Sequence, residues 1–132
     1  MSASPAITLY GIPNCDSVKK ARAWLADQGI PYRFHDFKKD GLTHAQASEW
    51  VHEVGIATLI NRRGTTWRML AKTEQARADD ERGAIVLMVK LPSIIKRPVV
   101  EIAADGSASG APETIVGFDA EVYAELFAGA KP

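Results

Sequence analysis

The sequence has a single cysteine, no excess of charge of one sign and no long apolar run. One cysteine excludes an internal disulfide and a cysteine-based zinc cluster. Sixteen basic and sixteen acidic residues cancel, whereas general nucleic-acid binders carry a basic excess, so we expect no direct DNA binding. No apolar run is long enough to span a bilayer, which excludes an integral membrane protein. The first residues do not resemble a secretion signal, so we expect a protein of the reducing cytoplasm.

Histidine is also scarce, and its spacing argues against a metal site. His35, His44 and His52 form no HExxH pattern. His44 and His52 are eight residues apart, which on one helix is farther than a single metal ion bridges. We therefore expect no bound metal, and we read the histidines as surface or boundary residues.

The N-terminal third predicts a strand, a helix and a second strand. Residues 7–10 are rich in β-forming side chains. Asn14 follows a turn and is the predicted N-cap of a helix, which Gly29 ends in the manner of a C′ glycine. Residues 32–37 alternate as in a strand, and residues 38–41 predict a loop.

The middle of the chain predicts helices. Thr43 is the predicted cap of a helix at 45–54, and Thr65 and Thr66 that of a short helix reaching about residue 70. Residues 74–89 predict one continuous helix with a very apolar end, which Pro92 stops.

The C-terminal third predicts two strands and a last helix. A strand begins at a proline within residues 97–102, and Asp105–Gly106 signals a hairpin. Residues 114–117 form the last predicted strand, and Asp119 caps a helix that runs to about Phe127. The order is β-α-β, helices, then β-β-α. It predicts one α/β domain over residues 1–132, with a small mixed sheet covered by helices and a helical insertion at about 43–91.

Cys15 is the main candidate for chemistry. It lies at the predicted start of a helix, where exposed N–H groups and the helix dipole favour a thiolate. Lys19, one turn further on, adds positive charge. Val18 stands where a C-x-x-C pair would have its second cysteine, so a mixed disulfide needs an external thiol such as glutathione. The alternative is an inert cysteine that fills space in the core.

Arginines near predicted turns form a second group of candidates. Arg62, Arg63 and Arg97 flank the ends of predicted strands or helices. Guanidinium groups near a thiolate lower its pKa and bind oxyanions or carboxylates, and the alternative reading is solvated loop charge. Pro98 fixes the backbone beside Arg97. The Arg97–Pro98 peptide bond is either cis or, as in an ordinary proline at an edge strand, trans.

Three segments together resemble the ArsC/Spx family, most closely its YffB-like subgroup. They are residues 11–22 (GIPNCDSVKKAR), 59–68 (LINRRGTTWR) and 90–100 (KLPSIIKRPVV). They occur in the family's order, and the similarity extends from about residue 7 to residue 127. It implies a thioredoxin-like fold with a helical insertion and a mixed four-stranded sheet.

The resemblance also implies roles for particular residues. Cys15 would be the nucleophile, and Arg97–Pro98 the cis-proline site that faces it. An arginine near Arg62 or Arg63 would frame the anion pocket together with Arg97. In the arsenate reductases of the family the cysteine attacks arsenate, and glutathione and glutaredoxin complete the reduction.

Several positions differ from those relatives. Gly11 replaces the histidine of the reductases and Lys19 replaces an arginine. No arginine lies between residues 102 and 118, and Asn61 takes the middle arginine position in an ungapped alignment. These differences weigh against arsenate as the substrate. Val18 removes the C-x-x-C switch of the Spx regulators, which weighs against a disulfide-switched regulator.

We therefore expect a glutathione-dependent thiol oxidoreductase, or an arsenate reductase-like protein, that acts as a monomer. Its partners would be glutathione or a small oxyanion, with glutaredoxin as a further electron donor and no tightly bound cofactor. Around the catalytic Cys15 we expect a substrate- and anion-binding set of Asn14, Lys19, Arg62, Arg63, Arg97 and Pro98. The alternative is a non-enzymatic, Spx-like regulator that binds RNA polymerase; an inert relative is the third possibility.

Overall fold

The computed structural model describes residues 6–103 and 113–127. The chain divides into two compact units. Unit 1 combines the chain up to Asp36 with the chain from Arg97 onward, and unit 2 is Phe37–Lys96. The helical insertion expected at about 43–91 falls within unit 2. The expected hairpin turn at residues 105–106 lies outside the described residues.

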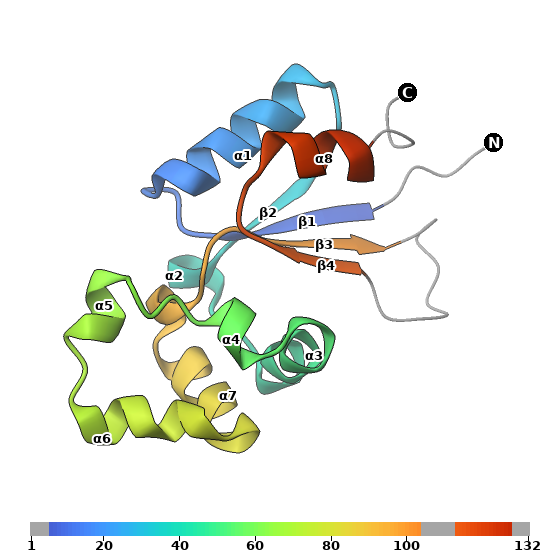
Figure 1. Ribbon diagram of the computed structural model, residues 1–132. Coiled ribbons are helices and arrows are strands. Elements are labelled where there is room, and N and C mark those ends of the chain that lie inside the picture. Colours follow the sequence, from blue (N-terminus) through green and yellow to red (C-terminus); the bar gives the residue numbers. More distant parts are fainter. Residues whose placement is uncertain (1–5, 104–112, 128–132) are drawn as a thin grey trace. The chain divides into compact units, whose positions relative to one another are not determined.

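Unit 1 is built on a mixed four-stranded sheet in the order β2-β1-β3-β4 (Figure 1). The strands are β1 (Ala6–Gly11), β2 (Arg33–Asp36), β3 (Val99–Ala103) and β4 (Glu113–Val116). β1 pairs in parallel with β2 and antiparallel with β3, which pairs antiparallel with β4. The predicted order of elements and the mixed sheet are confirmed.

Two helices cover one face of this sheet, α1 (Asp16–Asp27) and α8 (Ala120–Leu126) (Figure 1). Alternation along β1 turns Ile7 and Leu9 toward them, because successive side chains of a strand point to opposite faces. The buried cluster beneath the helices consists of Ile7, Leu9, Val18, Ala21, Leu25, Ile30, Val100, Tyr123 and Phe127.

The C-terminus of α1 ends as the sequence predicts. Gly29 has a φ of 68°, a left-handed conformation that glycine adopts without steric cost. Its N–H donates to the Ala26 carbonyl at 3.0 Å, and the Ile30 N–H donates to the Leu25 carbonyl at 2.9 Å. This pair of bonds is a Schellman motif, which directs the chain back into β2.

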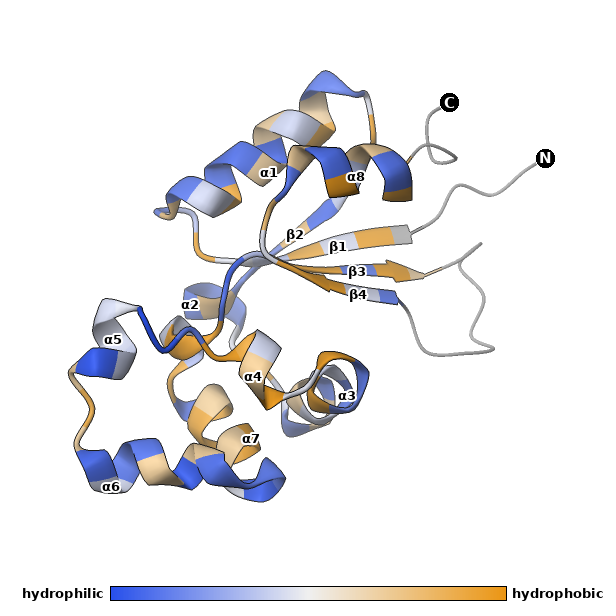
Figure 2. Cartoon of the chain, viewed as in Figure 1, coloured by the Kyte–Doolittle hydropathy of each residue, from blue (hydrophilic) through white to orange (hydrophobic). Residues whose placement is uncertain are grey.

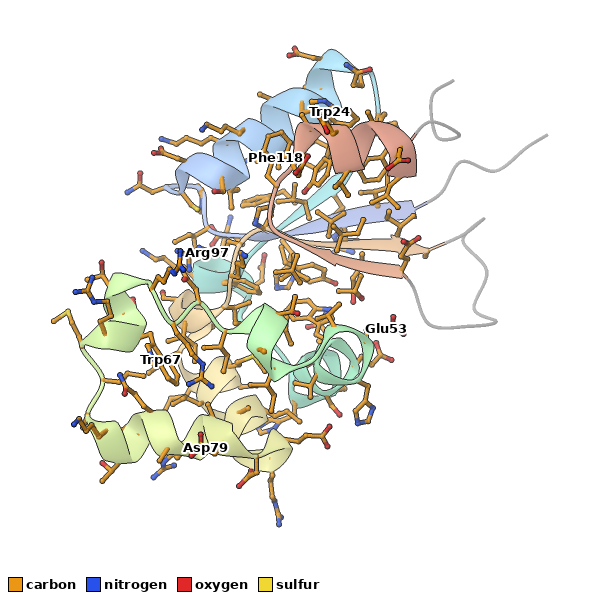
Figure 3. The ribbon with its side chains drawn as sticks, viewed as in Figure 1. Trp24, Glu53, Trp67, Asp79, Arg97 and Phe118 are labelled. Carbon is orange, nitrogen blue, oxygen red and sulfur yellow. The ribbon has the colours of Figure 1, made fainter. Side chains whose placement is uncertain are left out.

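An aromatic cluster holds α8 on the sheet. The fully buried ring of Tyr123 meets Trp24, Phe118 and Phe127 edge-on, at centroid distances of 5.6, 4.9 and 5.3 Å (Trp24 and Phe118 are labelled in Figure 3). Its hydroxyl donates to the Gly117 carbonyl at 3.1 Å. Burial raises the pKa of Tyr123 above its ordinary value, so the hydroxyl keeps its proton.

Unit 2 is helical. Its elements are α2 (Phe37–Asp40), α3 (His44–Val54), α4 (Ile56–Leu59), α5 (Thr65–Arg68), α6 (Lys72–Gln75), η1 (Ala76–Asp79), α7 (Glu81–Lys90) and η2 (Pro92–Ile94). α3 and α7 pack against each other, and Trp50, Leu87 and Met88 are fully buried. In the described part of the chain, no helix is long and apolar enough to cross a membrane.

Two helices of unit 2, α3 and α7, begin at capping side chains, and only the first of these caps is predicted from the sequence. Thr43 caps α3 in a complete capping box with Gln46, as predicted. The continuous helix predicted at 74–89 is wrong. The chain is extended at Asp80 (φ −128°, ψ 162°), whose side chain accepts the Gly83 N–H at 2.7 Å and starts α7 anew.

Three smaller predictions are also corrected. The expected strand at 32–37 stops at Asp36, because Phe37 begins the helical turn α2 where a loop was predicted. The short helix α5 is capped by Gly64 and not by a threonine side chain. Asp119, by contrast, caps α8 as predicted, and its carboxylate accepts the N–H groups of Glu121 and Val122.

Candidate functional site

Cys15 occupies the N-cap position of α1. Its backbone is extended (φ −143°, ψ 125°), Asp16 is the first helical residue, and the Cys15 carbonyl accepts the Lys19 N–H at 2.9 Å. The prediction that Asn14 is the N-cap is therefore wrong by one residue. Asn14 is exposed and lies in the turn that leads into the helix. The correction places the thiol itself where a capping side chain normally accepts backbone N–H groups.

The turn before Cys15 brings the end of β1 close to the first turn of α1. A Cβ atom on Gly11 would lie 2.6 Å from Cγ2 of Val18, so only glycine fits beside that side chain in its present position. Val18 is fully buried in the core of unit 1. Packing of Val18 thereby fixes the start of α1, and with it the position of Cys15.

Burial and nearby donors act on the Cys15 pKa in opposite directions. The largest single influence is burial, which raises the pKa because a charged thiolate loses water. It is outweighed by the Val18 N–H, by the hydrogen bond and charge of Arg97, and by the Ser17 N–H, so the pKa is lowered overall. The side chain closes no regular capping bond, but these donors face its sulfur. Cys15 is only partly buried, so the stabilised thiolate remains accessible to a reagent.

Arg97 and Pro98 lie at the start of β3 in the same unit. The Arg97–Pro98 peptide bond is cis, as the family resemblance implies. The buried Pro98 has a carbonyl that accepts the Gly117 N–H at 2.8 Å, which ties this corner to the end of β4. Arg97 is partly buried (labelled in Figure 3) and donates to the Cys15 sulfur. The structure thus brings Cys15 and Arg97 together within unit 1, and Pro98 directly follows Arg97.

Lys19 contributes less than the sequence suggests. It is exposed on α1, and the lowering of the Cys15 pKa comes from Val18, Arg97 and Ser17 without it. An ammonium group in water is well screened, whereas a partly buried guanidinium is not.

Arg62 and Arg63 belong to unit 2, where they line a pocket of about 430 Å³ with Ala57, Ile60, Asn61 and Lys96. The Arg62 guanidinium lies 4.9 Å from the centroid of the buried Trp67 ring, a cation–π contact. The Arg63 N–H donates to the Asn61 side chain at 3.2 Å, which shapes the loop.

Sequence reasoning missed Lys96 as a member of this pocket. Its N–H donates to the Leu59 carbonyl at 2.6 Å, and Ile95 bridges to Ile60. These contacts bring two segments together that are far apart in sequence. The feature of the sequence that could have indicated it is the position of Lys96 directly before the candidate residue Arg97. Among the described residues, no group of three histidine, cysteine or acidic side chains is placed to hold a metal ion.

Comparison with known proteins gives consistent matches over most of the chain. The model of the ArsC family matches residues 10–126. A protein of Haemophilus influenzae, named as uncharacterized, is 40% identical over 123 residues, which are 92% of this chain and 99% of its own. The global transcriptional regulator Spx of Listeria innocua is 29% identical over 96 residues, 71% of this chain and 72% of its own.

Solved structures match in the same way. The structure of a YffB protein is 42% identical, with a TM-score of 0.78 over 91% of this chain and 97% of its own. An arsenate reductase (ArsC) related protein from Brucella melitensis is also 42% identical, with a TM-score of 0.67 over 92% and 94%. An arsenate reductase from Vibrio cholerae, 15% identical, shares the fold with a TM-score of 0.69 over 93% and 98%.

Proposed function

Because the chain belongs to the ArsC family and has its thioredoxin-like fold, we propose that it is a glutathione-dependent thiol oxidoreductase with Cys15 as the nucleophile. The observation that carries this proposal is the partly buried thiol at the start of α1, with Arg97 and two backbone N–H groups directed at its sulfur. This environment favours the thiolate, which is the form that attacks disulfides.

The proposed reaction starts from a glutathionylated thiol. The Cys15 thiolate attacks the glutathione sulfur, a bond from Sγ to that sulfur forms, and the substrate sulfur leaves and takes up a proton from water. A second glutathione thiolate then attacks the glutathione sulfur of the mixed disulfide. This step yields glutathione disulfide and returns the Cys15 thiolate. In the net reaction the substrate disulfide is exchanged for glutathione disulfide: the substrate sulfur is reduced to a thiol and the incoming glutathione thiol is oxidised. An external thiol is required because the chain has one cysteine.

Cationic and polar side chains would recognise glutathione. We propose that Arg97, which lies in the same unit as Cys15, receives a carboxylate of glutathione, since a guanidinium group can bind a carboxylate through two hydrogen bonds. Asn14, Lys19 and Pro98 complete the proposed binding set. Glutathione acts as a co-substrate, glutaredoxin can serve as a further donor, and the cytoplasm supplies both under reducing conditions.

The first experiment measures the rate of Cys15 alkylation as a function of pH. We expect the alkylation rate to reach half its maximum at a lower pH than it does for a free cysteine, because the pKa of Cys15 is lowered. Arg97→Gln should move the profile to higher pH. The matched control, Arg33→Gln, removes an exposed arginine of the same unit and should leave the profile unchanged.

The same assay separates the candidate substrates. Protection of Cys15 by glutathione disulfide, together with reduction of a glutathionylated peptide, would support the proposal. Protection by arsenate alone would replace it with arsenate reduction. A profile like that of a free cysteine, with no protection by either compound, would refute both enzymatic functions.

The similarity to Spx regulators favours one second candidate, a non-enzymatic regulator that binds RNA polymerase. Such a protein would tolerate Cys15→Ser, whereas the thiol oxidoreductase would lose all activity. Co-purification with RNA polymerase that is equal for the wild type and Cys15→Ser would support the regulator. Absence of co-purification would exclude it.

A further inference from the structure

Unit 2 has an uneven distribution of charge along its sequence. Residues 54–73 contain four basic side chains, Arg62, Arg63, Arg68 and Lys72, and no acidic one. The next segment, residues 74–82, holds four acidic side chains and two basic ones: Glu74, Asp79, Asp80 and Glu81 against Arg77 and Arg82. A chain that is neutral overall therefore carries a local basic segment, which attracts anionic partners more strongly than its net charge suggests.

The pocket lined by Arg62 and Arg63 gives this charge a definite shape. Lys96 joins the two arginines there, and no acidic side chain lines the pocket. The Trp67 ring holds the Arg62 guanidinium in place, which reduces the entropy lost on binding. Figure 2 shows the loop between α4 and α5 as strongly hydrophilic.

Among residues 6–103 and 113–127, no acidic side chain forms an ion pair with a basic side chain of this segment. The His52–Glu81 and Arg77–Glu74 ion pairs use no cation of residues 54–73. Arg63, Arg68, Lys72 and Lys96 are exposed.

A large apolar side chain lies within the same segment. Met69 ends α5 and is 80% exposed, the highest value among the large hydrophobic residues in the described ranges. Methionine and arginine are enriched in protein–protein interfaces, and methionine adapts to varied apolar partners. An exposed methionine has no comparable use in binding a free inorganic anion.

We propose that Arg62, Arg63, Arg68, Lys72, Lys96 and Met69 form a docking surface for an acidic protein segment, called here the basic surface. Carboxylates of the partner would bind the pocket cations, and an apolar side chain beside them would contact Met69. The exposed Met69 in the same segment favours a protein over a nucleic acid, because an apolar side chain contributes to protein interfaces. The inference does not depend on the chemistry of Cys15.

The test uses the full chain and fluorescently labelled probes, with anisotropy as the readout. The probes are a short peptide rich in glutamate around a central leucine, its glutamine counterpart, the acidic peptide without leucine, and a single-stranded oligonucleotide. We expect the acidic peptide with leucine to bind most tightly, and its affinity to fall as salt is raised. Cys15→Ser should bind equally well.

Variants locate the binding. Arg63→Glu and Lys96→Glu should each weaken the peptide by about tenfold, whereas Arg82→Glu, an exposed cation outside the pocket, should have little effect. Met69→Ala should weaken only the peptide with leucine, by about threefold. Circular dichroism confirms that each variant is folded. Equal binding of the glutamine peptide, equal loss in the Arg82→Glu control, or tighter binding of the oligonucleotide would overturn the proposal.

Discussion

Replacing Tyr123 should show how much of the stability of unit 1 depends on the aromatic cluster. The ring is fully buried and meets three other aromatic rings edge-on. Truncation of a buried aromatic side chain to alanine costs about 3–5 kcal/mol, and the lost hydroxyl bond to Gly117 adds about 1 kcal/mol. We expect Tyr123→Ala to lower the free energy of unfolding by about 4–6 kcal/mol. Tyr123→Phe keeps the ring and should cost only about 1 kcal/mol.

Urea denaturation followed by far-ultraviolet circular dichroism measures both values. The matched control is Val122→Ala, an exposed neighbour on the same helix, which should change the stability by less than about 0.5 kcal/mol. A loss below about 2 kcal/mol for Tyr123→Ala would refute the argument that ring packing holds α8. Equal losses for the alanine and phenylalanine variants would assign the stability to the hydrogen bond instead.

Three further predictions concern pH and packing. Burial raises the folded-state pKa of Tyr123 above the ordinary value of 10, so the wild type should lose stability relative to Tyr123→Phe as pH rises above 10. A difference in the free energy of unfolding that stays constant above pH 10, measured by urea denaturation, would contradict this. Folding lowers the pKa of Cys15, so the thiolate stabilises the wild type relative to Cys15→Ala. This extra free energy of unfolding should be fully present above the unfolded-state pKa of about 8.5 and should disappear as pH falls through the folded-state pKa of Cys15. A stability difference that does not change with pH would refute the thiolate. Gly83→Ala should lower the free energy of unfolding by about 1–3 kcal/mol in thermal melts, because a Cβ there overlaps the Arg77 carbonyl, and an unchanged melting temperature would show that η1 can move aside.

Local chemistry in the sequence was sufficient for most of the fold. Gly29, Thr43 and Asp119 end or begin helices as predicted, since each acts through its own backbone geometry or a hydrogen bond within three residues. The break at Asp80 was missed because the apolar pattern on either side is compatible with one helix. The extended backbone at Asp80 separates η1 from α7. At the start of α7 the Arg77 carbonyl occupies the space that a Cβ atom on residue 83 would need.

The candidate site could be predicted in part for a similar reason. The start of a helix near Cys15 is a local property, so its favourable position for a thiolate was predicted, with an error of one residue in the cap. The contact between Arg97 and Cys15 and the place of Lys96 in the pocket depend on pairing between distant segments. A sequence alone lists such cations but does not say which of them meet.

The contact between Gly11 and Val18 links two sequence differences that appear unrelated along the chain. Gly11 and Val18 are the positions at which the family resemblance implies a histidine in the arsenate reductases and a cysteine in the Spx regulators. Here the valine methyl group fills the space that a side chain at residue 11 would need. In evolution, we therefore expect Val18 to be replaced by a smaller residue before Gly11 is replaced by a residue with a side chain. Exchange of both together should be less costly than the sum of the single exchanges, so each residue restricts the evolutionary routes open to the other.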